Sequence, residues 1–210
     1  MAFGGDRGSA ARARMVDEQI VARGISDPAV LAAMRRIPRD LFVPEEARDQ
    51  AYDDAPVAIG RGQTISQPYI VALMSELAGV GAASRVLEVG TGCGYQSAVL
   101  AACAAHVWTV ELEADLSARA GRTLAALGID NVSLRVGDGA DGWPEEAPFD
   151  AVVVTAAPAR TPPALLDQLG LGGRLVIPIG VSTQDLFVFT RSAAGIERRS
   201  VIPVRFVPLR

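Results

Sequence analysis

From residue 85 onward, short apolar runs alternate with longer segments in which apolar and polar residues are mixed. Short runs rich in valine, leucine and isoleucine are typical of β-strands, whereas apolar positions that recur every three or four residues predict helices. The predicted strands are 86–89, 107–111, 132–136, 151–155, 174–178, 186–190 and 201–206. The predicted helices, including one just before this part, are 69–77, 96–105, 112–127 and 163–169.

The order of these elements predicts the fold class. Alternating strands and helices favour a doubly wound α/β fold, and the apolar-rich runs 86–89 and 151–154 suit the centre of a parallel sheet. The last two strands lack a helix between them and have only the short segment 192–195 as a turn, so these should form an antiparallel hairpin. We therefore expect a mostly parallel, seven-stranded, Rossmann-like sheet with a C-terminal antiparallel hairpin.

A helical region precedes the alternating part. Helices are predicted over 11–23 and 28–36, with Ser26 and Asp27 as candidate caps and Pro28 in a first helical turn. A chain of 210 residues suits one domain with an ordinary hydrophobic core. The expected parts of this domain are a flexible arm, N-terminal helices with a polar loop, and the α/β core, at 1–10, 11–80 and 81–210.

Three alternating glycines connect the first core strand to the next helix. The strand 86–89 runs into Gly90, Gly92 and Gly94, and the helical pattern follows at once. Glycine permits positive φ and close approach of a ligand, and a helix N-terminus offers unpaired N–H groups. Dinucleotide folds space their glycines as G-x-G-x-x-G. The spacing G-x-G-x-G after an acidic residue, here Glu88, is instead the pattern of S-adenosylmethionine (AdoMet) methyltransferases; the alternative is a tight turn without a ligand.

Residues at the ends of the following strands complete a candidate cofactor site, because α/β sheets bind ligands outside the carboxyl ends of their strands. Glu111, about 20 residues beyond the glycines, can accept both hydroxyls of a ribose. Its alternative is a solvated acid. In AdoMet enzymes an acid at the position of Asp138 commonly contacts the adenine amino group, with the backbone around Gly139 framing the ring. Here the alternative is a simple Asp-Gly turn.

Two more residues are expected near this site. Glu88 lies inside the first strand, where an unpaired carboxylate would be costly. We expect it to accept hydrogen bonds from N–H groups of the glycine loop, in preference to reaching the cofactor's ammonium group through water. Thr155 ends the fourth strand and begins a run of small residues that could form a wall of the methyl-transfer centre.

Composition narrows the possible chemistry. The net charge of −4 does not favour nucleic-acid binding, and the absence of lysine excludes Schiff-base catalysis. One histidine, His106, leaves little for a zinc site or a Ser-His-Asp triad, and it is expected to be structural. Two cysteines are too few for a disulfide framework, which favours the cytoplasm. No apolar run approaches a membrane span, and residues 1–14 lack the apolar core of a signal peptide.

A polar segment before the glycine loop carries a family resemblance. Residues 60–68 read Gly-Arg-Gly-Gln-Thr-Ile-Ser-Gln-Pro, and structurally Ser66 there could be only a helix cap. Together with Val-Leu-Glu-Val-Gly-Thr-Gly-Cys-Gly-Tyr-Gln at 86–96, this segment closely resembles protein-L-isoaspartate O-methyltransferases. The similarity covers roughly 12–209. It extends through the segments 38–44, 51–54, 131–132, 137–139, 168–169 and 204–209.

The resemblance implies an activity and a set of site residues. It implies methyl transfer from AdoMet, leaving S-adenosylhomocysteine (AdoHcy), to the α-carboxylate of L-isoaspartyl residues in damaged proteins and peptides, with no metal and as a monomer. The ester then collapses to a succinimide that hydrolyses partly to aspartate. Ser66 would lie beside the acceptor carboxylate and 204–209 near the peptide. The expected cofactor residues are Glu88, Gly90, Thr91, Gly92, Cys93, Glu111, Leu112, Asp138, Gly139 and Thr155, and the expected substrate residues are Thr64, Ile65, Gln67, Val204 and Phe206.

The sequence departs from the family pattern at two points, and three other functions compete with the implied one. Cys93 replaces the serine usual in the glycine loop. Because the sequence ends at Arg210, just past the terminal motif, we expect no extra C-terminal contribution to peptide binding. Arg205 is left out of the catalytic set because a solvated strand position explains it equally well. The rivals are an aspartate methyltransferase for a dedicated biosynthetic peptide, a non-catalytic AdoMet-binding module, and an NAD dehydrogenase, whose glycine spacing differs.

Overall fold

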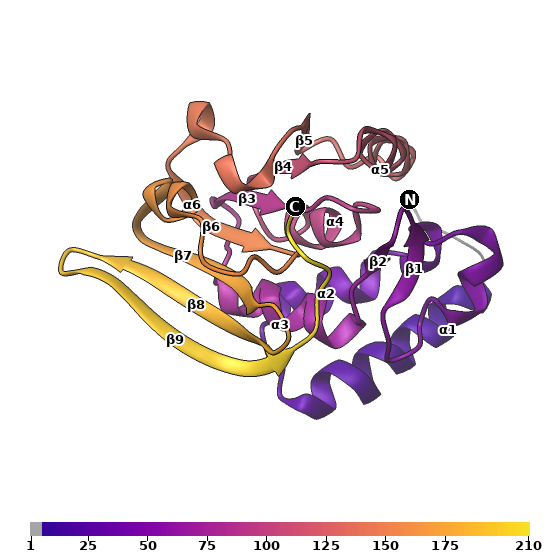
Figure 1. The fold of residues 1–210 in the computed structure, drawn as a ribbon. Helices are drawn as coiled ribbons and strands as arrows, with labels where there is room; N and C mark the ends of the chain where they lie inside the picture. The colour runs from indigo at the N-terminus through magenta and orange to yellow at the C-terminus, as the bar shows by residue number, and fades with distance from the viewer. Residues whose placement is uncertain (1–5) are drawn as a thin grey trace.

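The computed structural model describes residues 6–210. Within them, seven strands form the main sheet in the order β5-β4-β3-β6-β7-β8-β9, which confirms the predicted fold class (Figure 1). The strands from β5 to β7 are parallel, and β8 runs antiparallel to both of its neighbours. Their bounds are β3 Arg85–Val89, β4 His106–Glu111, β5 Val132–Val136, β6 Phe149–Val154, β7 Leu169–Gly180, β8 Gln184–Ser192 and β9 Gly195–Val204.

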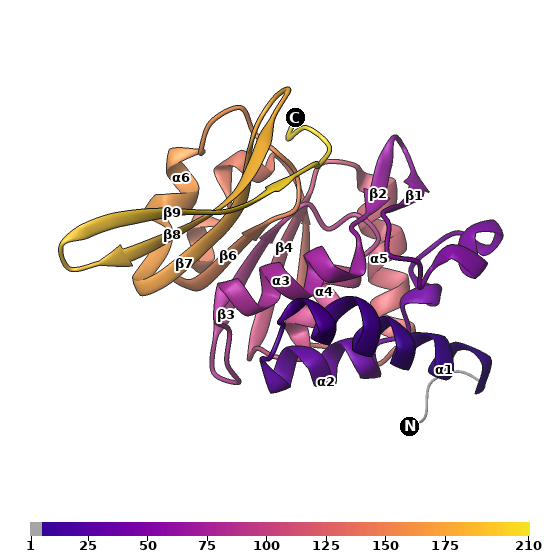
Figure 2. The ribbon, with the colours of Figure 1, turned by 90° about the horizontal axis from the view of Figure 1, so that it is seen from below.

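Alternate residues of the strands pack against different layers. One set, including Val86 and Val153, belongs to a large core with the N-terminal helices and α3, α4 and α5, whereas Leu87 and Val152 pack with α6 on the other face. Figure 2 shows α1 and α2 outside α3 and α4. The helix bounds are α1 Asp6–Arg14, α2 Pro28–Arg36, α3 Pro68–Ala78, α4 Tyr95–Ala101, α5 Ala114–Ala126 and α6 Pro163–Asp167.

Several predicted boundaries were wrong. The helix expected at 11–23 is α1 followed by a π-helical turn at Met15–Ile20 and a 3₁₀ turn at Val21–Arg23. Helix α1 begins at Asp6 and so includes residues 6–10 of the expected arm; the rest of that arm, 1–5, lies outside the described residues. Helix α4 ends four residues before the predicted 105, and β9 ends at Val204, so that 205 and 206 are not in a strand.

A short hairpin was not predicted. Strands β1 (Val57–Gly60) and β2 (Gln63–Ile65) pair antiparallel just before α3 and turn the polar segment back toward the glycine loop. The hairpin is fixed to α5, because Arg61 pairs with Asp115 and Arg119 donates to the carbonyl oxygen of Ile59. Residues Thr64 and Ile65 are therefore held beside the carboxyl ends of the sheet strands.

The C-terminal segment crosses the same end of the sheet. Ala157 donates through its N–H to the carbonyl of Val207 at 2.8 Å, and Leu209 donates to the carbonyl of Ala157 at 2.9 Å. The segment thus lies along the loop after β6 (Figure 1). Among the described residues no helix is both long and apolar enough to cross a membrane.

Candidate active site

The glycine loop begins with a residue that only glycine can occupy. Gly90 has φ of +95°, and a Cβ there would lie 2.4 Å from Oγ1 of Thr155. The Thr155 hydroxyl donates to the carbonyl of Gly90 at 2.6 Å and lies 3.1 Å from that of Val89. The loop after β6 therefore packs tightly against the loop after β3, and it leaves backbone rather than side chains facing the cavity beside them.

Glu111 links the glycine loop to the end of β4. Its Oε2 accepts a hydrogen bond from the N–H of Gly92 at 2.7 Å, and its Oε1 accepts one from the N–H of Glu113 at 3.0 Å. Each carboxylate oxygen has a further lone pair. The carboxylate is thus fixed by backbone while keeping the capacity to accept two hydroxyl groups.

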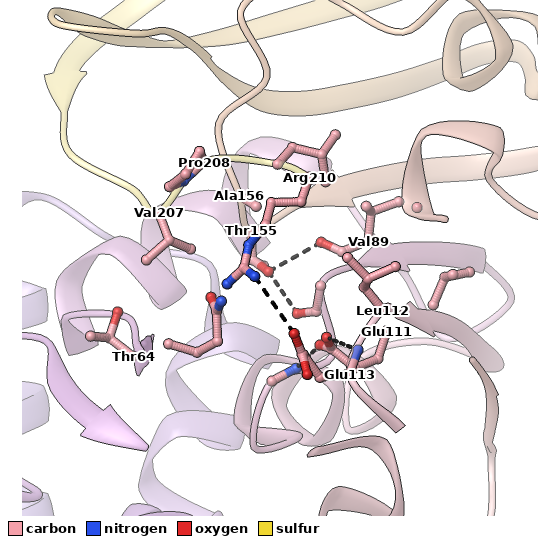
Figure 3. A pocket seen from close by; sticks show the side chains of 16 residues that line it. Thr64, Val89, Glu111, Leu112, Glu113, Thr155, Ala156, Val207, Pro208 and Arg210 are labelled. Carbon is pink, nitrogen blue, oxygen red and sulfur yellow. Dashed lines mark hydrogen bonds and ion pairs between the residues drawn. The ribbon is translucent and has the colours of Figure 1, made fainter. Parts of the chain in front are cut away.

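A cavity of about 70 Å³, called here the glycine-loop cavity, lies at the carboxyl ends of the parallel strands. Figure 3 shows Glu111 and Glu113 on one side of it and the C-terminal segment on the other. The guanidinium of Arg210 reaches across to the Glu113 carboxylate at 3.7 Å. The lining of the cavity comes from six segments: Gln63 and Thr64; Val89, Gly90 and Gly92; Val110 to Glu113; Gly139; Thr155 and Ala156; and Val207 to Arg210.

The expected cofactor residues divide among three cavities. A small cavity of about 30 Å³ is lined by Thr91 and Cys93 together with Gly90. Asp138 instead lines an outer cavity of about 610 Å³, and its carboxylate accepts from the N–H of Ala140 at 2.8 Å. The glycine-loop cavity itself holds six of the ten: Gly90, Gly92, Glu111, Leu112, Gly139 and Thr155.

Glu88 lines none of these cavities. It is fully buried, and its Oε2 is bonded to the hydroxyl of Ser97 in α4, so the expected hydrogen bonds from loop N–H groups were wrong. Burial raises the pKa of Glu88 to about 8, and the hydrogen bond from the Ser97 hydroxyl opposes this shift. Within the described residues, the other carboxylate oxygen, Oε1, is buried without a partner. Glu88 therefore contacts α4, the helix after the loop, rather than the loop itself.

A second large cavity, of about 440 Å³, lies between the polar segment and the C-terminal segment; we call it the terminal-segment cavity. Its lining includes the expected substrate residues Thr64, Gln67, Val204 and Phe206, with Ser66 and Arg205. Ile65 is buried in the core and lines the small cavity instead. The structure thus brings residues 64–67 and 203–207, far apart in the sequence, to one surface.

Ser66 is not a helix cap. The N-cap of α3 is Gln67, and no side chain caps this helix. Among the residues that the structure describes, the Ser66 hydroxyl makes no hydrogen bond. It lines both the small cavity and the terminal-segment cavity. Thr64 and Thr155 line these two and the glycine-loop cavity as well, so all three cavities meet around these side chains.

Some lining residues were missed by sequence reasoning. Gln63 and Pro56 are brought in by the unpredicted hairpin, and Glu113 directly follows the predicted site residue Leu112. Arg210 enters only because the C-terminal segment folds back over the sheet. The signal that could have found it was the resemblance of 204–209 itself, which already placed this segment near the site.

The remaining reactive side chains are explained by packing. The His106 ring contacts the Ser133 hydroxyl at 2.9 Å and packs on Trp108, and burial raises the pKa of the Cys93 thiol to about 11. Within residues 6–210, no group of histidine, cysteine, aspartate and glutamate side chains could hold a metal ion.

Comparison with known proteins gives a consistent result. The profile of the protein-L-isoaspartate(D-aspartate) O-methyltransferase family matches residues 10–210. A protein-L-isoaspartate O-methyltransferase of Picosynechococcus sp. is 52% identical over 99% of this chain and 93% of its own length.

Two solved structures are similar in fold as well as in sequence. A protein-L-isoaspartate O-methyltransferase is 30% identical with a TM-score of 0.84, over 94% of this chain and 65% of that one. A putative one from Plasmodium falciparum, in complex with AdoHcy, is 28% identical with a TM-score of 0.81, over 98% of this chain and 99% of that one. The chain therefore belongs to the protein-L-isoaspartate(D-aspartate) O-methyltransferase family.

Proposed function

We propose that this chain transfers the methyl group of AdoMet to the α-carboxylate of L-isoaspartyl residues in damaged proteins and peptides, as the first step of their repair. The observation that carries the proposal is the meeting of three cavities at Thr64 and Thr155, with Ser66 lining two of the three. A cofactor beside the glycine loop and a peptide against the terminal segment would approach each other there. The methyl ester then closes to a succinimide without further help, and hydrolysis returns part of it as aspartate.

The residues of the glycine-loop cavity fit the proposed cofactor. Vicinal ribose hydroxyls need acceptors, and Glu111 keeps a free lone pair on each oxygen. Backbone at Gly90 and Gly92 permits close approach of the chain that bears the sulfonium. Gly139 and Leu112 line the same cavity, where Gly139 would frame the adenine ring and Leu112 would supply an apolar surface. Asp138 lies at the outer cavity, from which it could reach the adenine amino group.

The reaction needs few catalytic side chains. A carboxylic acid with a pKa of about 4 is ionised at neutral pH and needs no general base. AdoMet supplies an activated methyl group, so no general acid is needed either. The chain's part is to hold one carboxylate oxygen in line with the methyl group and to exclude water. Holding reactants in a good orientation lowers a reaction barrier by roughly 7–11 kcal/mol. The free hydroxyl of Ser66 can orient the anion without a tight ion pair.

Methyl incorporation into two peptides that differ only in isoaspartate or aspartate at one position tests the proposal. Methylation of the isoaspartyl peptide alone supports repair. Methylation of the aspartyl peptide would instead favour the dedicated biosynthetic enzyme. Binding of AdoMet with no methylation of either peptide would contradict the acceptor assignment.

Three further expectations stay proposals. The chain is proposed to form one domain, to work as a monomer and to reside in the cytoplasm, where its two free cysteines would stay reduced. Light scattering of the purified protein measures the monomer mass directly, against the 21.9 kDa of one chain.

A further inference from the structure

The side-chain amide of Gln67 is fixed by two acceptors. Its Nε2 donates to Oδ1 of Asp54 at 2.8 Å and lies 3.1 Å from the carbonyl oxygen of the same residue. A backbone carbonyl can only accept, and a carboxylate paired with a guanidinium likewise accepts. The NH₂ end of the amide must therefore face Asp54, and this determines the position of the Oε1 atom.

Asp54 is itself held in place. Both of its carboxylate oxygens are bonded by Arg23, from Nη1 to Oδ1 at 3.2 Å and from Nη2 to Oδ2. The Arg23 guanidinium also lies 5.0 Å from the centre of the Tyr69 ring. Bidentate pairing fixes the direction of a carboxylate as well as its position. Arg23, Asp54 and Gln67 thus form a chain of contacts from the N-terminal helical region to the start of α3.

The carbonyl end of Gln67 is left available. Within residues 6–210, Oε1 accepts no hydrogen bond, and it is not among the buried unsatisfied atoms. Gln67 lines the terminal-segment cavity directly after Ser66 in sequence. The hydroxyls of Thr64 and Ser66 and the guanidinium of Arg205 in this cavity can donate to an anion, whereas the Thr155 hydroxyl already donates to the carbonyl of Gly90. The Gln67 oxygen is the side-chain group of this cavity that can only accept.

We propose that Gln67 accepts a hydrogen bond from a backbone N–H beside the isoaspartyl residue, and that Asp54 is the positioning residue that turns the Gln67 carbonyl toward the peptide. A peptide bound in this cavity brings an anionic carboxylate, which needs donors, and amide N–H groups, which need an acceptor. Ser66 supplies a donor for the carboxylate, and Gln67, the next residue, supplies an acceptor for an amide N–H. The inference rests on the proposed function, since it needs the acceptor peptide in this cavity.

Backbone-edited peptides test this assignment. The parent isoaspartyl peptide is compared with two versions in which an ester replaces the amide N–H of the isoaspartyl residue or of the next residue. With wild-type enzyme, one ester peptide should show a KM about 3- to 10-fold higher than the parent, the range expected for one net hydrogen bond. With Gln67→Ala, the KM of the parent peptide should rise by the same factor, and the KM of the ester peptide should be no higher than that of the parent.

Asp54→Asn tests the positioning role. Asparagine offers an NH₂ group as well as an oxygen, so the Gln67 amide can turn over and the ester effect should shrink, with kcat and AdoHcy affinity little changed. Asp17→Asn is the matched control. Asp17 also pairs with an arginine, Arg35, at 2.7 Å, but it does not line the terminal-segment cavity. It should keep the full ester effect. Thermal unfolding of each variant checks that it is folded.

Two results would overturn this inference while leaving the proposed function intact. An ester effect of the same size in wild type and Gln67→Ala would show that the N–H has another partner. An ester effect that persists in full in Asp54→Asn would remove Asp54 from its role. A wild-type enzyme that leaves the parent peptide unmethylated would contradict the proposed function, and the inference with it.

Discussion

The Glu111 carboxylate accepts the N–H of Gly92 at 2.7 Å, and so joins the end of β4 to the glycine loop after β3. Replacing it by glutamine puts an NH₂ group against one of the two backbone donors. We expect Glu111→Gln to raise the Kd of AdoHcy by about 10-fold or more, measured by calorimetry. Asp130→Asn, which removes an exposed acid just beyond α5, should leave the Kd unchanged. Equal affinity in Glu111→Gln and wild type would exclude the ribose role.

Ser66→Ala should act on turnover rather than on cofactor affinity. A hydrogen bond to a charged group is worth about 1.5–3 kcal/mol, so kcat should fall about 10- to 100-fold while the Kd of AdoHcy stays the same. The exposed Ser182 provides the control variant Ser182→Ala. A parallel loss of turnover and AdoHcy affinity would mean that Ser66 supports the local structure instead.

Gly90→Ala combines an unfavourable φ with a collision at Thr155. Gly128 also has positive φ, +65°, but a Cβ there would meet nothing within 4 Å. Gly128→Ala should therefore lower the free energy of unfolding only by the cost of a positive φ in alanine, about 1–2 kcal/mol. Gly90→Ala should lower the free energy of unfolding by more and abolish AdoHcy binding. Chemical denaturation of both variants separates the cost of the positive φ from the cost of the collision. Equal losses of unfolding free energy would show that Thr155 moves aside freely.

Glu88 should make stability depend on pH. Burial raises its pKa to about 8 from an ordinary value of 4.5, so the folded protein holds a proton that the unfolded chain has lost between these values. This site's contribution to the free energy of unfolding therefore falls as pH rises through that window. Glu88→Gln lacks the effect, so its Tm relative to wild type should rise from about pH 5 to about pH 9. A constant Tm difference would mean that Glu88 titrates normally.

The central sheet could be predicted because its signal is local. Apolar runs such as that at 151–154 and the glycines after Val89 fix strands and turns within a few residues. The β1–β2 hairpin could not be found in this way, because β2 is only three residues long and its position depends on distant contacts. Arg61 pairs with Asp115 of α5, and Arg119 of α5 donates to the carbonyl oxygen of Ile59.

The sequence predicted many of the residues of the site but not the contacts between them. Strand-end residues such as Glu111 follow from topology, which places all carboxyl ends at one edge. The partners of Glu88, and the approach of Arg210 to Glu113, depend on side chains from segments distant in sequence. Likewise, nothing local shows that Asp54 turns the Gln67 amide, because the contact forms only when the segment before β1 packs on the start of α3.

The fate of a single isoaspartyl peptide tests the account most directly. Incubated with the enzyme and AdoMet, and followed by chromatography and mass measurement, the peptide should pass through a methyl ester and a succinimide and accumulate as the aspartyl form. Ser66→Ala should slow the first of these steps alone. An isoaspartyl peptide that stays unmethylated while AdoHcy binds the protein would contradict the account.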